Sequence, residues 1–526
     1  MPERWVKAIN RDALKRKGRA VVRRGGKQVV LFDTAKGVFA CNNRCPHEGY
    51  PLRDGTVDDH CVVTCHWHNW KFDLASGDNL YGGDRLRVYP VDLRDGEVWV
   101  DLGDPPFEAR RAEIMASLRA AFDDHEYDRI AREIARLGRA GADPLEAVVA
   151  AIDWSHDRFE FGWTHAYAVI ADWLALYDEH EGDDAARLVC LLESVGHVAD
   201  DVLREKTFPY PPEPLPWDED GFVAAIDAED EAAVGMMRGA LDAGFGFAKV
   251  ERGLARAALA HYNDFGHSLI YTVKAGRLIA RLGAGVAQPL LLSLVRSLVF
   301  AFREDHIPEF RGYTGALAAW SGKARRVAPE AAAFRGLNAR QALRLTAAHG
   351  GAEPLVLYRA LLGANAANML AYDTSYQERT EGPIRDNVGW LSFTHGITFA
   401  NAVRAVCEAY PELWPAGLLQ MACFAGRNAA YTDESLDGAR WRVAEPEAFF
   451  AESVAGLFDH GRDEYIVSAH FLKTLTAARE ELRSGAAGEA APDLVAALNR
   501  LIHSPLRFKH VRRTAEQALA FVRLDG

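Results

Sequence analysis

Residues 45–47 read Cys-Pro-His and, after seventeen further residues, residues 65–68 read Cys-His-Trp-His. Each stretch offers one thiolate and one imidazole. Four such ligands suit tetrahedral zinc, or an iron–sulfur cluster in which the cysteines bind one iron and the histidines bind the other. Soft thiolates hold iron and sulfide well, and neutral imidazoles make such a cluster easier to reduce. The two stretches therefore predict a small metal-binding domain, and an iron cluster is the interpretation that we favour.

The residues around these ligands favour iron over zinc. Pro46, the turn at residues 49–52 (Gly-Tyr-Pro-Leu) and the run at residues 68–73 (His-Asn-Trp-Lys-Phe-Asp) resemble the two cluster-binding loops of Rieske ferredoxins and Rieske oxygenases. The resemblance covers the N-terminal part of the chain. It implies a [2Fe–2S] cluster with these ligands: Cys45 and Cys65 on one iron, His47 and His68 on the other.

Three neighbours of these ligands are not assigned to the cluster. His66 lies between ligands but outside the ligand positions of the family. Cys41 and Cys61 each precede a ligand cysteine by four residues, which differs from the extra, disulfide-forming pair of high-potential Rieske proteins. Seven cysteines in 526 residues suit a reducing compartment, so we expect free thiols and a cytoplasmic protein.

The composition, 49% hydrophobic and 26% charged, is that of an ordinary globular protein. The formal net charge of −13 argues against nucleic acid as a partner. Residues 1–27 are polar and basic, without the apolar segment of a signal peptide. The longest apolar run, residues 287–302, is interrupted by glutamine, proline and arginine, and is predicted to be a buried helix rather than a membrane span.

Two kinds of pattern follow one another along the chain. In the N-terminal part, short β-rich runs alternate with glycine-containing turns, which predicts a small antiparallel β domain. Residues 101–106 (DLGDPP) form a turn-rich joint. From residue 108 onward, apolar residues recur at three- and four-residue spacings, as in amphipathic helices. We predict a multidomain protein, with the Rieske domain at residues 1–105 and a large all-α domain at residues 106–526.

The helical domain lacks the iron motif of conventional Rieske oxygenases. That motif is an acidic or amide residue followed by two closely spaced histidines, which form a 2-His-1-carboxylate site. The nearest pattern begins at Asp153 and His156, but the next histidine, His165, lies too far along the chain. The cluster domain is therefore predicted to be joined to a different kind of domain.

Fourteen of the eighteen histidines follow residue 104, and four of them lie in strongly apolar helical runs: His165, His267, His395 and His470. One such histidine is more often a core residue bonded to a carbonyl than a metal ligand. Four are harder to dismiss, because helices of one bundle converge on a shared interior where ligands from different helices bind iron.

Lys473 is predicted to lie one helical turn from His470 on the same face. Such a lysine either extends outward to solvent or, if it is buried, loses its proton. A neutral amine can react with CO₂ to give a carbamate, which binds metal as a carboxylate does. Lys274, two helical turns from His267, is the rival for a buried lysine.

At these residues the helical region resembles the questin-oxidase-like family, oxygenases of aromatic polyketides. The resemblance is carried by His165 and by three short motifs, residues 267–270 (HSLI), 395–398 (HGIT) and 470–473 (HFLK). It departs at Tyr271, where some members have a second histidine, and known members lack a fused cluster domain. The resemblance implies a mononuclear non-heme iron with these ligands: His165, His267, His395, His470 and a carboxylated Lys473.

These observations predict a Rieske-dependent oxygenase. An external reductase or ferredoxin reduces the cluster, the cluster reduces the helical iron from Fe(III) to Fe(II), and the ferrous ion activates O₂ to oxidise a small organic substrate, aromatic or polyketide. The sequence leaves open the substrate, mono- or dioxygenation and whether the chain forms a homo-oligomer. The candidate substrate contacts, which are equally typical of plain core, are Trp163, Tyr167, Trp390, Phe393 and Phe399.

Two other functions stay open. The chain could be a Rieske ferredoxin-type electron carrier whose helical domain docks another protein and holds no second metal. It could also be a di-iron carboxylate oxygenase, since an acid-x-x-His spacing occurs twice. Candidate residues for a di-iron site are Asp153, His156, Asp264, His267, Glu193, His197, Asp172 and Asp201, while His261, His306 and His503 are predicted to be structural or surface residues.

Overall fold

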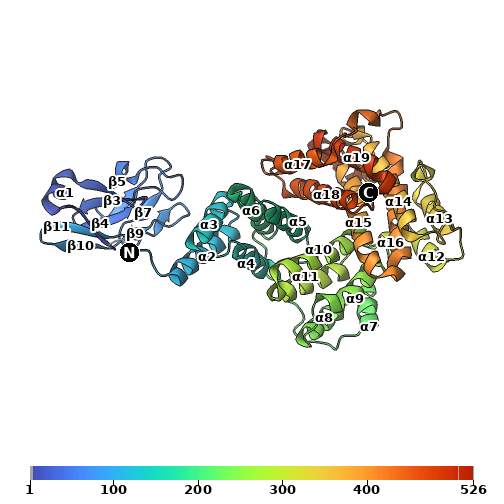
Figure 1. Ribbon diagram of the computed structural model, residues 1–526, viewed down its shortest axis with the longest axis horizontal. Coiled ribbons are helices and arrows are strands. Elements are labelled where there is room, and N and C mark those ends of the chain that lie inside the picture. The colour runs from blue at the N-terminus through green and yellow to red at the C-terminus, as the bar shows by residue number, and fades with distance from the viewer. Residues whose placement is uncertain (1–3, 508, 525–526) are drawn as a thin grey trace. The chain divides into compact units, whose positions relative to one another are not determined.

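The computed structural model describes residues 4–507 and 509–524 (Figure 1). They divide into two compact units, Met1–Pro144 and Leu145–Gly526. The first unit holds the β-strands, and the second is helical. The predicted order, a small antiparallel β domain followed by a large helical region, is confirmed.

Three antiparallel sheets make up most of the first unit. The strand orders are β1-β11-β10, β2-β3-β4-β9 and β5-β6-β7-β8. The strands are β1 Trp5–Asn10, β2 Arg19–Arg24, β3 Lys27–Thr34, β4 Gly37–Asn42, β5 Thr56–Val57, β6 Val62–Thr64, β7 Lys71–Asp73, β8 Asn79–Tyr81, β9 Val88–Tyr89, β10 Val91–Arg94 and β11 Glu97–Asp101. Two short helices accompany them, α1 Arg11–Lys17 and η1 Leu52–Asp54.

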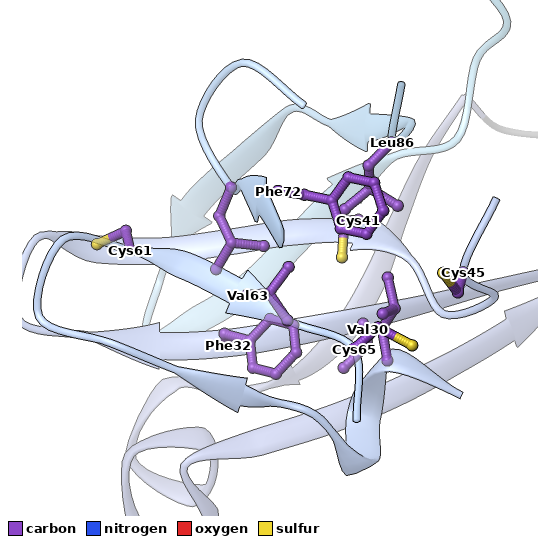
Figure 2. Close-up of a cluster of buried hydrophobic side chains, with 11 residues drawn as sticks. Val30, Phe32, Cys41, Cys45, Cys61, Val63, Cys65, Phe72 and Leu86 are labelled. Atoms are coloured by element: carbon purple, nitrogen blue, oxygen red, sulfur yellow. The ribbon is translucent and has the colours of Figure 1, made fainter. Parts of the chain in front are cut away.

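Strand β3 contributes side chains to two hydrophobic cores of the first unit, one on each of its faces. Side chains alternate between the two faces of a strand, so Val30 and Phe32 lie on one face and Val29 and Leu31 on the other. The face with Val30 and Phe32 packs against side chains of the sheet β5–β8 (Figure 2). All four residues are buried, which accounts for the uninterrupted apolar run of this strand.

The first unit continues beyond the strands with two helices, α2 Phe107–Asp123 and α3 Tyr127–Ala140. They pack against each other, and α3 is bonded to the loop after β8, as described below. The compact unit therefore extends to Pro144, past the predicted domain boundary after residue 105. The division into domains at residues 1–105 and 106–526 stays a prediction.

The second unit is built from helices. The α-helices are α4 Glu146–Ser155, α5 His165–Glu179, α6 Asp184–Asp201, α7 Glu219–Asp227, α8 Ala232–Asp242, α9 Phe247–Leu259, α10 His267–Leu282, α11 Ala287–Val299, α12 Gly312–Ala318, α13 Ala339–Ala348, α14 Pro354–Leu370, α15 Trp390–Ala409, α16 Trp414–Asn428, α17 Pro446–Leu457, α18 Tyr465–Arg483, α19 Ala491–His503 and α20 Val511–Val522. The 3₁₀ helices are η2 Asp264–Gly266, η3 Ala284–Val286, η4 Glu304–His306, η5 Ala331–Phe334, η6 Thr374–Gln377, η7 Ile384–Asp386, η8 Pro411–Leu413, η9 Ala429–Tyr431, η10 Gly438–Trp441 and η11 Gly488–Ala490.

Four helices of this unit form a closed ring of contacts. Helix α5 packs on α10, α10 on α15, α15 on α18, and α18 returns to α5. Helix α5 begins at His165 because the Thr164 hydroxyl caps it by accepting the Ala166 N–H. The ring places the N-terminal turns of helices that are far apart in the sequence around one interior.

Within the described residues, no helix is long and apolar enough to cross a membrane. The apolar run that begins at residue 287 forms α11, whose leucines are buried against neighbouring helices. The predicted buried helix is therefore confirmed for residues 287–299, while Phe300 and Phe302 at the end of the run are exposed.

Candidate metal centres

The two loops that carry Cys45 and Cys65 have the same backbone design. In each loop the cysteine N–H donates to the carbonyl five residues later, at 2.9 Å for Cys45 and 2.8 Å for Cys65. The N–H four residues later returns to the cysteine carbonyl, at 2.9 Å in both loops. That fourth residue is Gly49 in one loop and Asn69 in the other, with left-handed φ angles of +77° and +63°. Glycine and asparagine tolerate this conformation best, so these residue types allow both loops to close.

The paired loops bring the four predicted cluster ligands together. The Cys45 and Cys65 thiols are buried at the end of the core in Figure 2 and interact with each other. The His47 and His68 rings lie 4.6 Å apart, and their side chains are 24% and 40% exposed. Two sulfur atoms inside and two imidazoles outside match the ligand division of a Rieske cluster.

Polar atoms in these loops fit the cluster. The backbone N–H groups of His47 and Glu48 donate to the Cys45 sulfur, which stabilises a thiolate. Burial, followed by the neighbouring Cys65, raises the pKa of the Cys45 thiol to about 12, and a bound metal reverses this by removing the proton. The buried Nδ1 of His47 has no hydrogen-bond partner among the described residues, which is the condition expected of a nitrogen that binds a metal.

Two neighbours hold the His47 and His68 rings. Trp70 stacks on His47 with a centroid distance of 4.4 Å and an interplanar angle of 11°. The Glu48 carboxylate lies 3.9 Å from Nε2 of His47 and 3.8 Å from Nδ1 of His68. His66 instead contacts the Thr56 hydroxyl at 3.2 Å, away from the predicted ligand set.

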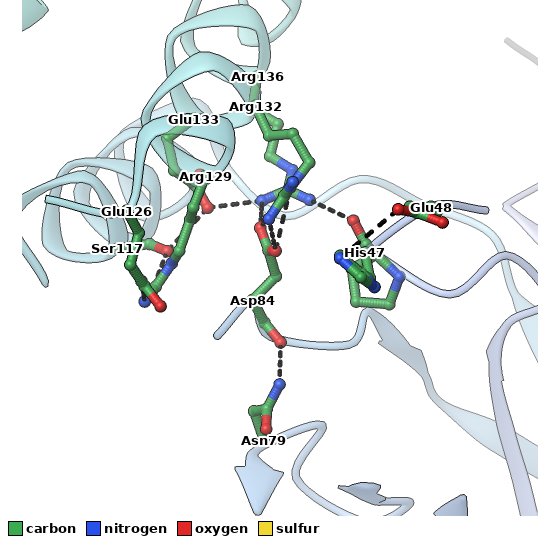
Figure 3. Close-up of polar contacts among 11 residues, drawn as sticks. His47, Glu48, Asn79, Asp84, Ser117, Glu126, Arg129, Arg132, Glu133 and Arg136 are labelled. Carbon is green, nitrogen blue, oxygen red and sulfur yellow. Dashed lines mark hydrogen bonds and ion pairs between the residues drawn. The ribbon is translucent and has the colours of Figure 1, made fainter. Parts of the chain in front are cut away.

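Helix α3 is fastened to the loop after β8 by a buried carboxylate (Figure 3). Asp84 is fully buried and accepts from Arg132 Nη2 at 2.6 Å and from Arg136 Nη1 at 2.5 Å. Burial alone would raise the pKa of Asp84, but the two arginines outweigh it and hold the pKa below its ordinary value. Arg136 Nη2 also lies 3.5 Å from the carbonyl oxygen of Pro46, between two predicted cluster ligands.

The cysteines outside the ligand set form no disulfide within the described part of the chain. Cys41 and Cys61 are free and buried, as expected. Cys61 contacts the Thr34 hydroxyl at 3.4 Å, and burial raises the pKa of the Cys41 thiol.

The four predicted histidines of the helical unit lie together. His165 begins α5 and His267 begins α10, while His395 and His470 lie in the first two turns of α15 and α18. The Nε2 atoms of His165 and His267 are 3.2 Å apart, and those of His395 and His470 are also 3.2 Å apart. Nitrogen atoms about 2.1 Å from one shared metal ion lie roughly 3.0–3.4 Å apart. Each of these two pairs therefore has the spacing of two ligands on one ion, and the three histidines whose ligand atoms all lie within 4.8 Å of one another are His165, His395 and His470.

The other ring nitrogen of these histidines is used to orient them. Nδ1 of His267 lies 2.7 Å from the Asp264 carbonyl oxygen, and Nδ1 of His470 lies 2.6 Å from the Ile466 carbonyl oxygen. A ring that donates from Nδ1 has its lone pair on Nε2, which is the arrangement of most metal-binding histidines. Both rings thus present Nε2 to the common interior.

Electrostatics keeps this interior neutral. Burial and the nearby Lys473 lower the pKa of His267 to about 3. The same two causes, burial first, lower the pKa values of His165 and His470 well below the ordinary value, and burial with the neighbouring histidines does so for His395. Neutral imidazoles are the protonation state that binds a metal.

Lys473 is the lysine beside these histidines. It is 1% exposed, and its Nζ has no hydrogen-bond partner among the described residues. Burial lowers the pKa of Lys473 to about 7, so much of the amine is neutral at physiological pH. The rival, Lys274, is instead ion-paired with the buried Asp172 at 2.6 Å. An unpartnered neutral amine fits a carboxylated ligand better than a paired ammonium.

The carboxylates suggested for a di-iron site make other contacts. Asp172 binds Lys274 and the Thr476 hydroxyl, and Glu193 lies 3.1 Å from Nε2 of His460. The Asp201 carboxylate accepts the Thr164 hydroxyl at 2.5 Å. In the described part of the chain, the helical group able to hold a metal consists of His165, His395 and His470, without a carboxylate.

The remaining predicted residues are placed as follows. His156 bonds the Asp153 carbonyl at 2.9 Å and stacks on Tyr210, and His197 stacks on Tyr465. Of the candidate substrate contacts, Trp163 lies 5.7 Å from the ring of Tyr271, which in turn lies 6.2 Å from that of His165. Trp390 and Phe393 pack on Tyr372, as core residues do.

Sequence reasoning missed several residues that shape these centres. Gly49 and Asn69 stand at the same offset from Cys45 and Cys65, a regularity that was available in the sequence. Nothing in the sequence indicated the structural roles of Asp84 and Glu304, because the residues that they contact are far away in the sequence. Glu304 is discussed below.

Comparison with known proteins agrees with the N-terminal centre. Residues 4–87 match the family model of the Rieske [2Fe–2S] domain. A 4beta-methylsterol monooxygenase of Methylococcus capsulatus is 36% identical over 96 residues, 16% of this chain and 26% of that protein. A 3-phenylpropionate/cinnamic acid dioxygenase ferredoxin subunit of Escherichia coli is 32% identical over 76 residues, 14% of this chain and 72% of the subunit.

Among solved structures, the terminal oxygenase of carbazole 1,9a-dioxygenase from Nocardioides aromaticivorans is 28% identical with a TM-score of 0.18, over 19% of this chain and 31% of that chain. The chain thus spans only about a quarter of the methylsterol monooxygenase, and the family match ends at residue 87. Through this N-terminal part, the chain belongs to the Rieske [2Fe–2S] domain family.

Proposed function

We propose that this protein is a Rieske-dependent non-heme iron oxygenase. Cys45, His47, Cys65 and His68 hold the [2Fe–2S] cluster, and His165, His267, His395, His470 and a carboxylated Lys473 hold one iron ion in the helical unit. When bound, the cluster supplies single electrons and the iron activates O₂. An external reductase or ferredoxin supplies the electrons, and the substrate is a small organic molecule, aromatic or polyketide.

The observation that carries the proposal is the convergence of the four histidines. Residues spread from position 165 to position 470 meet as two pairs, His165 with His267 and His395 with His470, each with an Nε2 spacing of 3.2 Å, beside an unpartnered, buried lysine. A core histidine normally finds a carbonyl or hydroxyl partner for each nitrogen. Here the Nε2 atoms face one another instead, which favours a metal-binding role over ordinary packing.

The protein's own residues prepare this site in three ways. The Asp264 and Ile466 carbonyls fix the tautomers of His267 and His470. Burial keeps the four imidazoles neutral, so that no proton competes with the metal. Burial also keeps Lys473 largely neutral, the form that reacts with CO₂. Carboxylation would add the negative charge that the histidine group lacks.

Metal analysis tests the proposal. Wild-type protein is expected to contain three iron atoms per chain, two in the cluster and one in the helical unit. The double substitution His395→Ala/His470→Ala is expected to reduce the content to two and to abolish substrate-dependent O₂ consumption, with the visible spectrum of the cluster unchanged.

The matched control is His156→Ala/His503→Ala. These histidines also donate from Nδ1 to a carbonyl three or four residues earlier, but they lie outside the converging group. The control is expected to keep three irons. If the His395/His470 variant kept three irons and full O₂ consumption, the helical iron site would be disproved.

The second candidate is a ferredoxin-type electron carrier. It is favoured by one observation: the relative most fully covered among those described above is a ferredoxin subunit. An electron carrier would contain two irons per chain, and a di-iron oxygenase would contain four. The iron count therefore separates all three functions.

A further inference from the structure

Three consecutive residues before α10 have a left-handed backbone. The φ angles are +49° at Asp264, +46° at Phe265 and +86° at Gly266. Glycine adopts such angles freely and aspartate occasionally, but for phenylalanine they are unusual. His267 follows directly as the first residue of α10. A strained conformation of this kind persists only where surrounding contacts impose it.

The contacts that impose the turn come from residues 302–304. The Asp264 N–H donates to the Phe302 carbonyl at 2.8 Å, and the Glu304 N–H donates to the Tyr262 carbonyl at 3.0 Å. Glu304 then turns its side chain back, and Oε1 accepts the Phe265 N–H at 2.5 Å. Glu304 is 1% exposed, so water does not compete for this bond.

The peptide group between Asp264 and Phe265 links this carboxylate to His267. Its N–H is held by Glu304, and its carbonyl oxygen lies 2.7 Å from Nδ1 of His267. Because the peptide group is planar, fixing the N–H also fixes the direction of the carbonyl. The carbonyl in turn orients the imidazole, whose Nε2 lies 3.2 Å from that of His165.

Packing closes the turn on its other side. A Cβ atom on Gly266 would lie 2.6 Å from the ring of Phe399, on helix α15 that also carries His395. The Phe265 ring contacts Tyr262 and Phe310. The turn therefore cannot relax toward α15.

We propose that Glu304 is the positioning residue of the helical metal site: through the Asp264–Phe265 peptide it holds His267 in the orientation that binds iron. The inference rests on the proposed function, because it assigns a role toward the same iron. Glu304 touches neither iron nor substrate and acts only through the turn. No periodicity in the sequence links residue 304 to residue 267.

The test is the affinity of the helical site for Fe(II), measured by titrating protein that contains the cluster but lacks the third iron. Glu304→Ala is expected to weaken Fe(II) binding roughly 10–100-fold, as loss of a partner of a ligating histidine does. The electron paramagnetic resonance signal of the Fe(II)–nitric oxide adduct is expected to change shape. Glu304→Gln is expected to restore both, because the amide oxygen can accept the same Phe265 N–H.

The control is Asp305→Asn. Asp305 is the next residue of the same 3₁₀ helix, but its carboxylate pairs with Arg303 instead of the turn. This variant is expected to bind Fe(II) like the wild type. If Glu304→Ala proved unfolded by circular dichroism, Glu304→Asp would replace it, since the shorter side chain keeps the carboxyl group but does not reach the Phe265 N–H.

If Glu304→Ala left both the Fe(II) affinity and the electron paramagnetic resonance signal unchanged, the inference would be overturned and the proposed function would stand. The same holds for Glu304→Asp where that variant replaces Glu304→Ala. Equal losses in Glu304→Ala and Glu304→Gln would also overturn it, because the hydrogen bond would then not be the cause. Wild-type protein that bound no third iron would instead refute the proposed function, and the inference with it.

Discussion

Two groups of imidazoles in this protein stand in opposite settings. In the Rieske domain, the predicted ligands lie within residues 45–68, and the His47 and His68 side chains are 24% and 40% exposed. In the helical unit, the histidines come from four helices; His470 and Lys473 are 3% and 1% exposed, and His165, His267 and His395 are half-buried. An exposed imidazole edge suits electron exchange with a partner, whereas a buried group suits chemistry from which water is excluded.

The difference extends to what holds each centre in place. The cluster loops close through their own backbone hydrogen bonds, five residues apart. The helical histidines depend on a ring of helix contacts and on distant residues such as Glu304. A local design tolerates change elsewhere in the chain, and a distributed design does not.

The largest effect is expected when the ligands of one centre are removed and the metal content of the other is measured. Cys65→Ser is expected to abolish the cluster, because serine replaces the thiolate that iron and sulfide require. The helical iron is expected to remain, so the iron content falls from three per chain to one. Metal analysis and the visible spectrum check this. A chain that lost all its iron would show that the second centre depends on the first.

How well each centre could be predicted follows from the same contrast. Cys45, His47, Cys65 and His68 stand at fixed short spacings, so residue types alone indicated their chemistry, and the family comparison supports a Rieske cluster. His165, His267, His395 and His470 were proposed from short motifs in apolar runs, and the structure brings them together, while their role as iron ligands stays a prediction.

Other features could not be predicted, because they depend on contacts between distant residues. Asp84 bonds Arg132 and Arg136, which lie 48 and 52 positions later in the chain. The sequence therefore did not reveal that α3 belongs to the first compact unit. Glu304 meets Phe265 across 39 positions. Nothing in the residue type of Phe265 indicates a left-handed backbone, because tertiary contacts impose it against the residue's own preference.

The buried amine of the helical centre gives the next prediction. Burial lowers the pKa of Lys473 from 10.5 to about 7. Between these values Lys473 binds more protons in the unfolded chain than in the folded chain. Its own contribution to the stability of the iron-free protein therefore rises with pH from about 7 upward and is flat below that. From pH 7 to pH 9 the gain is expected to approach ~2 kcal/mol, and Lys473→Met is expected to remove it.

Urea unfolding at the two pH values, followed by helical circular dichroism in CO₂-free buffer, measures this gain. Lys274→Met is the comparison, because Lys274 is held by Asp172. Burial also raises the pKa of Glu304 to about 8, which lowers stability over the same range, so the Lys473 contribution is the difference between the wild type and Lys473→Met. An identical pH dependence in these two proteins would show that Lys473 stays protonated. Added bicarbonate is expected to raise the Fe(II) affinity of the wild type but not of Lys473→Met.

The carboxylate that fastens α3 gives a smaller effect. Asp84→Asn removes a fully buried charge from between Arg132 and Arg136. Breaking a buried pair costs several kcal/mol, but both arginines are partly exposed, so we expect a loss of about 2 kcal/mol in the unfolding of the first unit. Because the pKa of Asp84 is held below its ordinary value, this stabilisation is present at neutral pH and is lost as the pH falls through the acid range.

Loss of cluster absorbance in urea at neutral pH measures this effect in the full chain. The control is Asp92→Asn, which breaks the exposed pair with Arg94 in the same unit and is expected to leave the stability of the unit nearly unchanged. Equal effects of the two substitutions would mean that α3 contributes nothing to the stability of the cluster domain.

The smallest expected effect concerns the potential of the cluster. Arg136 Nη2 lies 3.5 Å from the Pro46 carbonyl, so a permanent positive charge stands beside the loop that carries Cys45 and His47. Reduction adds negative charge to the cluster, which a nearby cation stabilises, so Arg136→Gln is expected to lower the midpoint potential slightly. Arg132→Gln, which also releases Asp84 but has no bond to the loop among the described contacts, is expected to lower the midpoint potential less.

Redox titration at low and high ionic strength separates a charge effect, which salt screens, from a rearranged loop, which salt leaves unchanged. A shift confined to Arg136 would mean that a helix outside the matched Rieske residues tunes the exposed centre, which would then be less purely local than its sequence motif implies.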